Sequence, residues 1–499
     1  MSKPPAGAGD PDRFGRVEQA GVEYIPEDRR NSGPLNVFTV FFSGTLAFGV
    51  IVFGWLPITY GLSFPAAVTA SLAGIALGTL LVAPLGLLGP RTGTSTPVAS
   101  GAHFGVTGRL IGSVLTLLFA LAYAAIAIWT SGDALVAGID RLFGVPVGDG
   151  TRAIAYGLIA AEIVVVALYG HGTVVGMQRI VLPVVGVLLL AGIPAFLPDF
   201  RSAPEGTGTY LLGDFWTTWV FAVVIAIGGP LSYASGMGDY TRRVARRHGD
   251  RRVLLACGGG LFLGLSLTAA FGAFTASAFG GFTGSYADGM VSLAPDWYVV
   301  PILLIALVGG LGQGVMAVYA SGLDLGALIP RARRVPSTVL TSAASVALVY
   351  LGAVVVDAVD SITAMTIVLN VFAGPWTVVI LIGFLRTRRR GYDPLDLQVF
   401  NERRSGGRYW FTGGWNLRAV VPFAAGSVFG LLAVETSLFS GPLARLAGGV
   451  DLSVLGSTLI TAVGYLLVSW RWPEQPAVVA APDEPAPHGG QGSQAARDR

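Results

Sequence analysis

The sequence has little charge, one cysteine and one lysine. Only 12% of its 499 residues are charged while 53% are hydrophobic, and this balance excludes a soluble globular protein. The single cysteine, Cys257, allows no internal disulfide and supplies no metal cluster. Lys3 is the only lysine, so arginine carries the positive charge, a bias typical of a GC-rich bacterial genome. The net charge of +3 does not indicate a nucleic-acid partner.

Long apolar blocks fill the chain. About twelve of them have the length that a helix needs to cross a bilayer, which predicts an all-α, polytopic membrane protein. We expect the spans at residues 35–60, 64–88, 110–138, 153–169, 174–197, 215–238, 253–280, 299–320, 337–356, 361–385, 419–438 and 452–472. The short turn at 357–361 predicts that the ninth and tenth spans pack as antiparallel neighbours.

Positive charge collects in alternate loops between these spans. Four arginines lie on one side, and the other 28 of the 32 Lys and Arg residues lie on the opposite side: Arg141, Arg152, Arg201 and Arg445 are the four. The positive-inside rule then places both termini in the cytoplasm of a multi-pass protein of the cell membrane. The polar first 34 residues predict no cleavable signal peptide before the first span.

Glycine is concentrated inside the spans. Most of the 70 glycines are explained by close helix packing, but two clusters look different. The first span contains Ser43-Gly44-Thr45, Gly49 and Gly54, and the sixth contains Gly228-Gly229-Pro230. Proline in the second cluster removes a backbone donor, so we expect the helix to break near mid-membrane and leave polar peptide groups for a ligand. For both clusters the alternative is a plain packing kink. Breaks in the leading helices of two five-span halves are typical of a transporter built from inverted repeats.

This interpretation divides the chain into six parts. They are a cytoplasmic N-terminal tail (1–34), repeat one (35–197), repeat two (215–385), a cytoplasmic loop (386–418), two additional spans (419–472) and a disordered cytoplasmic tail (473–499).

An ordered set of motifs resembles the purine/cytosine permease branch of the nucleobase-cation symporter family. The motifs are GVEYIPEDRR (21–30), TYGLSF (59–64), GPRTGTSTPVASGAHFG (89–105), SYASGMGDYTRRV (232–244), VYASGLDL (318–325) and RRRGYDPLDL (388–397). The resemblance implies a LeuT-like five-plus-five inverted-repeat core with two further C-terminal helices. It also implies uptake of a nucleobase or related heterocycle together with an ion, by alternating access.

The resemblance also implies where the substrate binds. A ring would lie between the third and sixth spans and receive hydrogen bonds from the eighth. Tyr123 falls where relatives place a stacking tryptophan, and Ser232 matches a substrate-contacting hydroxyl. The substrate-binding candidates are Tyr123, Ala127, Gly228, Gly229, Pro230, Ser232, Gln313 and Met316.

The eighth span departs from the sodium-dependent members of the family. Gly312 and Gln313 lie where those members carry hydroxyl ligands, and Gly312 offers only its carbonyl. We therefore expect weak or no sodium dependence, which leaves proton coupling or facilitated diffusion. No cofactor is expected.

A proton-coupled carrier needs an ionisable group near the pathway. Asp133 in the third span and Glu162 in the fourth are candidates, each with a structural alternative as a polar helix contact. Asp239 and Arg242 form either a gate pair or a helix-end salt bridge, and Asp324 is equally ambiguous. No metal site is expected, because the histidines have no partners at ligand spacing.

Other functional classes remain as alternatives. A membrane enzyme would need clustered acid, base or metal groups at one membrane face, and the Asp, Glu and His residues are dispersed. A channel would need rings of pore-lining polar groups, which broken helices do not favour. The main alternative is a carrier for another small solute on the same scaffold, such as a hydantoin, allantoin, a vitamin precursor or an amino acid. The sequence does not indicate the oligomeric state.

Overall fold

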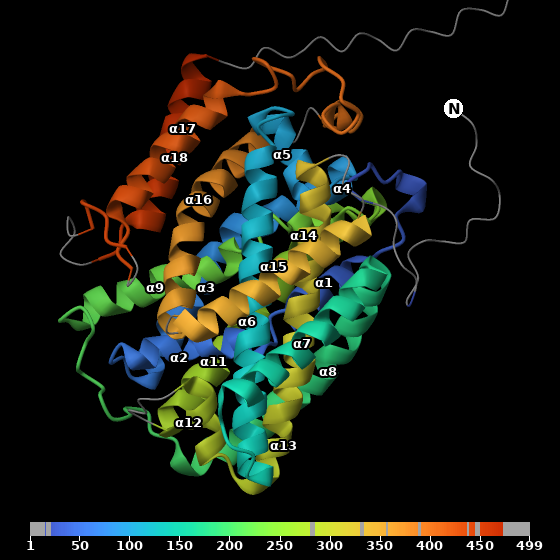
Figure 1. The fold of residues 1–499 in the computed structure, drawn as a ribbon. Coiled ribbons are helices and arrows are strands. Elements are labelled where there is room, and N and C mark those ends of the chain that lie inside the picture. Colours follow the sequence, from blue (N-terminus) through green and yellow to red (C-terminus); the bar gives the residue numbers. More distant parts are fainter. Residues whose placement is uncertain are drawn as a thin grey trace, which may run out of the picture.

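The computed structural model describes most of the chain as a bundle of helices (Figure 1). The described residues are 15, 21–279, 285–329, 334–355, 358–387, 391–436, 439–444 and 450–472, and they contain no β-strand. The helices at the positions of the predicted spans are α1 (Pro34–Ser43), α2 (Phe48–Thr59), α3 (Phe64–Val82), α6 (Leu110–Phe143), α7 (Asp149–Tyr169), α8 (His171–Phe196), α9 (Phe215–Leu231), α11 (Asp250–Phe279), α13 (Asp296–Leu304), α14 (Gly310–Leu328), α15 (Arg334–Val355), α16 (Ala358–Thr387), α17 (Leu417–Ala433) and α18 (Ser453–Arg471). Shorter helices are α4 (Leu88–Thr92), α5 (Thr96–Phe104), α10 (Met237–Thr241), α12 (Tyr286–Leu293) and the π-helical turn η5 (Ile305–Gly309). The 3-10 turns are η1 (Glu27–Arg29), η2 (Ala83–Leu87), η3 (Leu197–Asp199), η4 (Arg246–His248) and η6 (Asp396–Gln398).

The helices agree with the predicted spans to within a few residues at most ends. Nine helical segments of the described chain are long and apolar enough to cross a membrane, and the bent pair α1 and α2 makes a tenth. The two shorter apolar helices α9 and α17 stand at the remaining predicted positions. A polytopic all-α architecture is therefore confirmed.

The helix pairs that pack together repeat between the two halves. α1 and α2 lie against α11, and α3 lies against α9. The first of these contacts joins spans one and seven, and the second joins spans two and six. If each span is exchanged for its counterpart five places along the chain, one contact becomes the other. α6 packs on α14, the third span on the eighth, and this pair is unchanged by the same exchange. Two repeats related by a pseudo-two-fold axis produce this pattern.

The first span is broken where the glycines predict. α1 ends at Ser43, α2 begins at Phe48, and the two helices are bent by 57°. A Cβ on Gly44 would lie 2.1 Å from a methionine sulfur of α14, and one on Gly54 would lie 2.1 Å from a backbone oxygen of α11. These glycines therefore also permit a close approach that larger side chains would prevent.

The break in the sixth span comes later than predicted. α9 continues through Gly228–Pro230, and residues 232–236 form the turn before α10. The Ser232 N–H donates to the Gly228 carbonyl (3.1 Å), and the Ser232 hydroxyl donates to the Gly229 carbonyl (2.7 Å). The sequence predicted free peptide groups at these glycines. Instead, Ser232 closes the helix end and occupies the carbonyls of Gly228 and Gly229.

The segment after the second span is a buried helical layer and not the simple loop that was predicted. α4 and α5 occupy much of it, and all nine residues of α5 are buried. Small hydroxyl side chains tolerate this burial by bonding to their own backbone: Thr92 donates to the Leu88 carbonyl and Ser100 to the Pro97 carbonyl. A hydropathy profile does not identify such residues as part of the buried core, because their side chains are small and polar.

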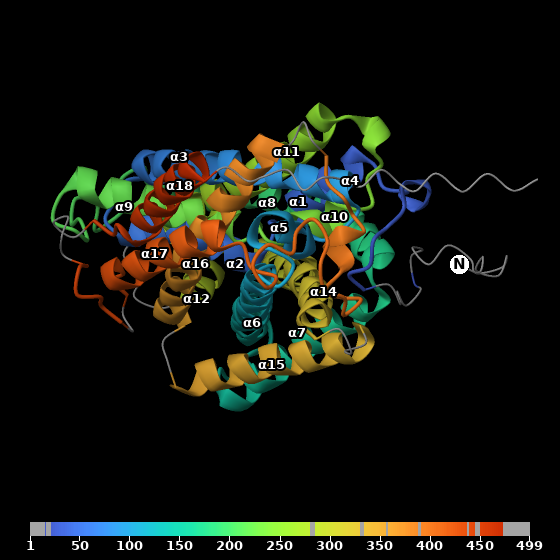
Figure 2. The ribbon, with the colours of Figure 1, turned by 90° about the horizontal axis from the view of Figure 1, so that it is seen from above.

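The predicted antiparallel pairing of the ninth and tenth spans is wrong. α15 packs along α14, α6 and α7, and it has little contact with α16. α16 instead packs on α17 and α18, which lie against each other at one edge of the bundle (Figures 1 and 2). The connection between α15 and α16 lies partly outside the described residues.

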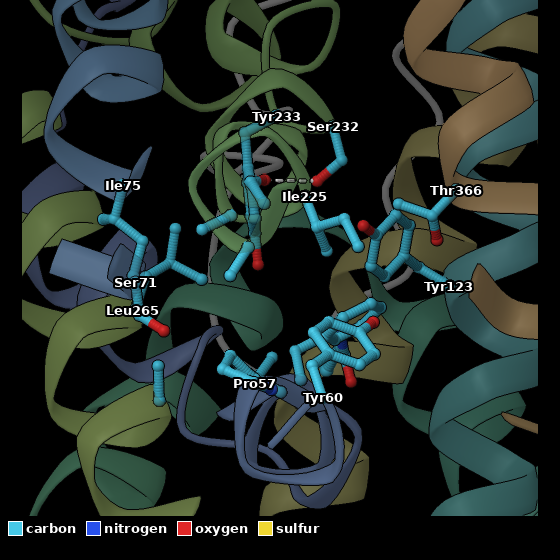
Figure 3. Close-up of a pocket in the computed structure, with 17 residues that line it drawn as sticks. Pro57, Tyr60, Ser71, Ile75, Tyr123, Ile225, Ser232, Tyr233, Leu265 and Thr366 are labelled. Atoms are coloured by element: carbon cyan, nitrogen blue, oxygen red, sulfur yellow. Dashed lines mark hydrogen bonds between the residues drawn. The ribbon is translucent and has the colours of Figure 1, made fainter. Parts of the chain in front are cut away.

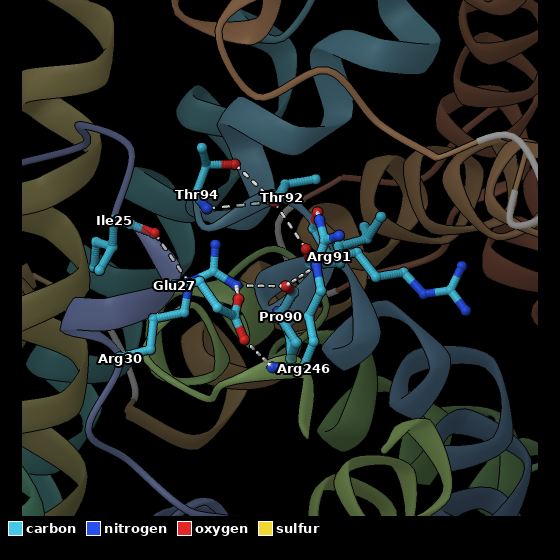
Figure 4. Close-up of polar contacts among 9 residues, drawn as sticks. Ile25, Glu27, Arg30, Pro90, Arg91, Thr92, Thr94 and Arg246 are labelled. Carbon is cyan, nitrogen blue, oxygen red and sulfur yellow. Dashed lines mark hydrogen bonds and ion pairs between the residues drawn. The ribbon is translucent and has the colours of Figure 1, made fainter. Parts of the chain in front are cut away.

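Arginines fasten the segment before α1 to the helical layer (Figure 4). Arg30 donates to the carbonyls of Ile25 (2.9 Å) and Pro90 (2.6 Å) and pairs with Glu27 (2.6 Å). Glu27 in turn accepts the backbone N–H of Arg246 (2.6 Å). Arginines on this side of the bundle therefore stabilise the loops in addition to their expected role in topology.

Candidate functional site

A cavity, here called the first cavity, lies beside the broken helices. It is bounded by α2, α3, α6, α9, α11, α14 and α16 and by the turn after α9. Its wall is mainly apolar, with polar side chains from Ser71, Tyr123, Ser232, Gln313 and Thr366 among others. Tyr123 and Thr366 lie on the side of the cavity opposite Ser71 (Figure 3). A mostly apolar wall with a few polar groups is typical of small-molecule sites.

A second cavity lies toward α10. It is bounded by α6, α10, α14 and the turn between α9 and α10. Four residues belong to the walls of both cavities: Tyr123, Ser232, Tyr233 and Gln313. A small molecule held by these four residues therefore borders both cavities.

Two tyrosines connect the broken helices near this position. Tyr233 Oη donates to the Gly44 carbonyl at 3.4 Å, which joins the turn after α9 to the break between α1 and α2. Tyr240 Oη donates to the Met316 carbonyl of α14 at 3.1 Å. The Phe41 ring packs edge-on against both tyrosines, at centroid distances of 6.2 and 5.7 Å. Aromatic contacts thus position both tyrosines from the α1 side.

An amide side chain from α14 completes the boundary between the cavities. Gln313 is 4% exposed, and its Oε1 accepts no hydrogen bond from the described residues. A Cβ on Gly49 would lie 3.3 Å from this oxygen, so glycine keeps α2 close to the amide. A buried acceptor without a donor is unfavourable, and a ligand N–H would satisfy it.

Comparison with known proteins identifies the family. A family model described as a permease for cytosine/purines, uracil, thiamine and allantoin matches residues 24–456. The chain belongs to this permease family. A relative, the putative purine-cytosine permease YxlA of Bacillus subtilis (strain 168), is 23% identical over 473 residues, covering 91% of this chain and 97% of that protein. The resemblance inferred from the motifs is confirmed, and the family is one of transporters.

Solved structures show the same fold. Mhp1, a nucleobase-cation-symport-1 family transporter in a closed conformation with bromovinylhydantoin bound, has a TM-score of 0.70 and 17% identity, covering 91% of this chain and 96% of that chain. The inward-facing conformation of Mhp1 has a TM-score of 0.66 and 17% identity, covering 92% and 95%. A Na⁺-coupled sialic acid symporter in a substrate-bound outward-open state has a TM-score of 0.55 and 12% identity, covering 88% and 91%.

In this permease, five of the eight predicted substrate-site residues line the two cavities. They are Tyr123, Gly229, Ser232, Gln313 and Met316. The structure therefore brings together residues from the third, sixth and eighth spans, although they are separated by up to about 190 positions in the sequence.

The other three predicted residues line neither cavity and occupy helix contacts. A Cβ on Gly228 would lie 2.4 Å from the Asn370 amide nitrogen of α16. The Pro230 ring lies 3.0 Å from the Cβ that a glycine of α3 would carry. Ala127 is fully buried, and its carbonyl oxygen lies 3.6 Å from a Cβ placed on Gly310 where α6 meets α14.

Sequence reasoning missed several polar residues of the site. Tyr233 and Tyr240 belong to the motif of the sixth span but were not among the candidates. Thr366 of α16 lines the first cavity, and Asn370, one turn further along α16, lines neither cavity. Both residues are buried, and neither Thr366 Oγ1 nor Asn370 Oδ1 has a hydrogen-bond partner among the described residues. Their spacing of four residues on one face of an apolar span is a signal that could have identified them.

The acidic candidates fall into two groups. Asp133 accepts a hydrogen bond from Tyr156 of α7 at 2.6 Å, and Glu162 is half-buried on α7 itself. Neither residue lines either cavity. For Asp133, the structural alternative of a polar contact between helices agrees with its bond from α6 to Tyr156 of α7.

The second group is deeply buried near α10. Asp239 and Asp324 are both 0% exposed, and they interact electrostatically with each other and with Arg242. No described residue donates a hydrogen bond to either carboxylate. Arg242 Nη1 donates to the Gly21 carbonyl at 2.8 Å. Among the described residues, no group of three or more His, Cys, Asp or Glu side chains is arranged to hold a metal ion.

Proposed function

We propose that the protein imports a nucleobase or a related flat heterocycle by alternating access. The observation that carries this proposal is the set of four residues that two cavities share: Tyr123, Ser232, Tyr233 and Gln313. In the predicted topology the first cavity lies toward the outside and the second toward the cytoplasm. A substrate held between them is reached from each side in turn when one helix bundle rocks against the other.

The chemistry of the shared residues suits a flat, polar ring. Tyr123 and Tyr233 offer aromatic surfaces for stacking. The Gln313 amide offers an acceptor beside a donor, which complements the amide or amidine edge of a nucleobase. The Thr366 hydroxyl of α16 adds a further polar group to the wall of the first cavity. An aliphatic amino acid would use the aromatic surfaces poorly, which favours a heterocycle over this alternative.

Coupling to protons and not to sodium is part of the proposal. Of the acidic candidates, Asp239 and Asp324 have the environment that best supports proton binding, because two neighbouring carboxylates are buried without a hydrogen-bond donor among the described residues. A protonated carboxyl group is much less costly to bury than a carboxylate. Asp239→Asn should therefore weaken the stimulation of uptake by an inward proton gradient. An Asp239→Asn variant with the wild-type pH profile would reject this residue as the proton carrier.

Uptake of radiolabelled cytosine and purines into proteoliposomes tests the function. Tyr123→Ala should abolish saturable uptake because it removes one stacking surface. Tyr169→Ala, on the exposed side of α7, is the matched control and should transport normally. Normal saturable uptake by Tyr123→Ala would remove this residue from the site.

The Gln313 amide has its own test. Gln313→Leu replaces the amide with an apolar side chain of similar size that cannot hydrogen-bond. The loss of one such hydrogen bond to the substrate, about 1.4 kcal/mol, should raise the half-saturation concentration about tenfold. Competition by uracil, hydantoin, allantoin and thiamine in the same assay ranks the alternative solutes. If none of the heterocycles competes or is taken up, the proposed substrate class is wrong.

A further inference from the structure

The side chain of Gln178 bridges the broken first span and the eighth span. Gln178 lies in α8 and is 0% exposed. Its Nε2 donates to the Gly312 carbonyl of α14 at 2.7 Å. Its Oε1 lies 2.6 Å from the Ser43 hydroxyl at the end of α1, and this hydroxyl shares its single proton between Gln178 Oε1 and the Thr39 carbonyl at 2.5 Å. The amide orientation is fixed, because the Gly312 carbonyl can only accept a hydrogen bond.

This joint is the kind of place where a transporter binds a coupling cation. Helix C-terminal ends carry partial negative charge, and unwound carbonyls of broken helices coordinate Na⁺ in transporters of this construction. Here the end of α1, a hydroxyl group and a carbonyl of α14 converge on one point. The sialic acid symporter with the same fold is named as Na⁺-coupled.

The atoms present do not form a cation site. A cation needs several oxygen atoms directed at it, but at this joint an amide N–H is directed at the Gly312 carbonyl. Three carbonyls next to the break also accept hydrogen bonds within the chain. Those of Val40, Ser43 and Gly44 accept from the Gly44 N–H (2.9 Å), the Leu46 N–H (3.0 Å) and the Tyr233 hydroxyl (3.4 Å).

We propose that the Gln178 amide takes the place of a coupling cation between α1 and α14, so that transport does not use sodium. The proposal rests on the proposed function as a carrier. The positive end of the amide dipole holds the Gly312 carbonyl and the negative end holds Ser43. This link is neutral and permanent, so no ion has to bind or leave the joint in each cycle.

The substitution Gln178→Glu tests this role because it preserves shape. A protonated Glu still donates to the Gly312 carbonyl and accepts from Ser43. An ionised Glu places a carboxylate oxygen against the carbonyl oxygen, and the joint then requires a proton or a cation. Uptake by Gln178→Glu without sodium should fall as pH rises, by up to about tenfold per pH unit once the carboxyl group is ionised. Sodium should restore uptake at high pH.

Two controls accompany this variant. Gln398→Glu makes the same chemical change at a buried glutamine in η6, and it should create no new dependence of uptake on pH or sodium. Wild-type uptake should be equal in sodium and choline buffers. A pH and sodium profile of Gln178→Glu that matches wild type would overturn the proposal.

A binding measurement separates this proposal from the proposed substrate. Without any substrate, the thermal midpoint of the purified wild-type protein should be equal in NaCl and choline chloride, because a bound ion would raise it. A sodium-dependent rise would overturn the proposal even if Gln178→Glu does not fold. Absence of heterocycle uptake together with equal midpoints would reject the substrate class and leave the role of Gln178 supported.

Discussion

Acid should destabilise the protein through His103, a buried residue of α5. The residue is 1% exposed, its Nδ1 lies 2.4 Å from the position of a Cβ on Gly383, and its Nε2 lies 3.2 Å from the Tyr392 hydroxyl. Burial lowers the pKa of His103 from 6.5 to about 4. The folded protein therefore keeps His103 neutral at a pH where the unfolded chain protonates it.

The difference between the two pKa values gives the magnitude. Because the folded state has the lower pKa, stability is complete above pH 6.5 and is lost as the pH falls from 6.5 toward 4. One pKa unit corresponds to 1.36 kcal/mol, so the loss through His103 is about 2 kcal/mol between pH 8 and pH 5 and approaches about 3 kcal/mol below pH 4.

Thermal or denaturant unfolding of the detergent-solubilised protein between pH 8 and pH 5, followed by tryptophan fluorescence, measures this loss. His103→Gln retains a hydrogen-bonding side chain beside Tyr392 but does not titrate, so its stability should fall less than that of the wild type. His248→Gln, in η4, is the matched control and should follow the wild type. If His103→Gln and the wild type lose stability equally between pH 8 and pH 5, the burial argument is refuted.

Two further predictions concern helix contacts. Gly54→Leu should destabilise the protein by about 3 kcal/mol in the same thermal assay, because a Cβ at Gly54 would already lie 2.1 Å from the Ala269 carbonyl oxygen. Gly186→Ala should be neutral or stabilising, because a Cβ at Gly186 would meet no atom within 4 Å. Asp133→Asn should leave the pH profile of uptake unchanged, because Asp133 accepts from Tyr156 away from both cavities; a shifted profile would restore it as a proton carrier.

The spans were predictable because each one depends on local composition. A bilayer requires a run of apolar residues whatever the neighbouring helices are, so the ends of α8, α11 and α16 follow from the sequence within a few residues. The break in the sixth span was misplaced because its position depends on Ser232, whose hydroxyl closes the end of α9. The buried layer of α4 and α5 was missed because its threonines, serines and glycines appear polar or neutral to hydropathy.

The site was only partly predictable because it depends on how each helix is rotated. Motif positions grouped Tyr123, Ser232 and Gln313, and all three line both cavities. Gly228 and Pro230 are within four residues of Ser232 but face α16 and α3. One helical residue turns the side-chain direction by about 100°, so neighbours in a motif can serve different contacts.

Gln178 shows which signal reveals such a contact in advance. An amide in an apolar span is unfavourable unless both its donor and its acceptor are satisfied, so Gln178 in the midst of valines, leucines and isoleucines predicts partners on neighbouring helices. Sequence alone does not identify those partners, because Ser43 and Gly312 are each more than 130 positions away. Gly312 lacks a side chain that could bond to α1 directly, and Gln178 makes that connection from a third helix.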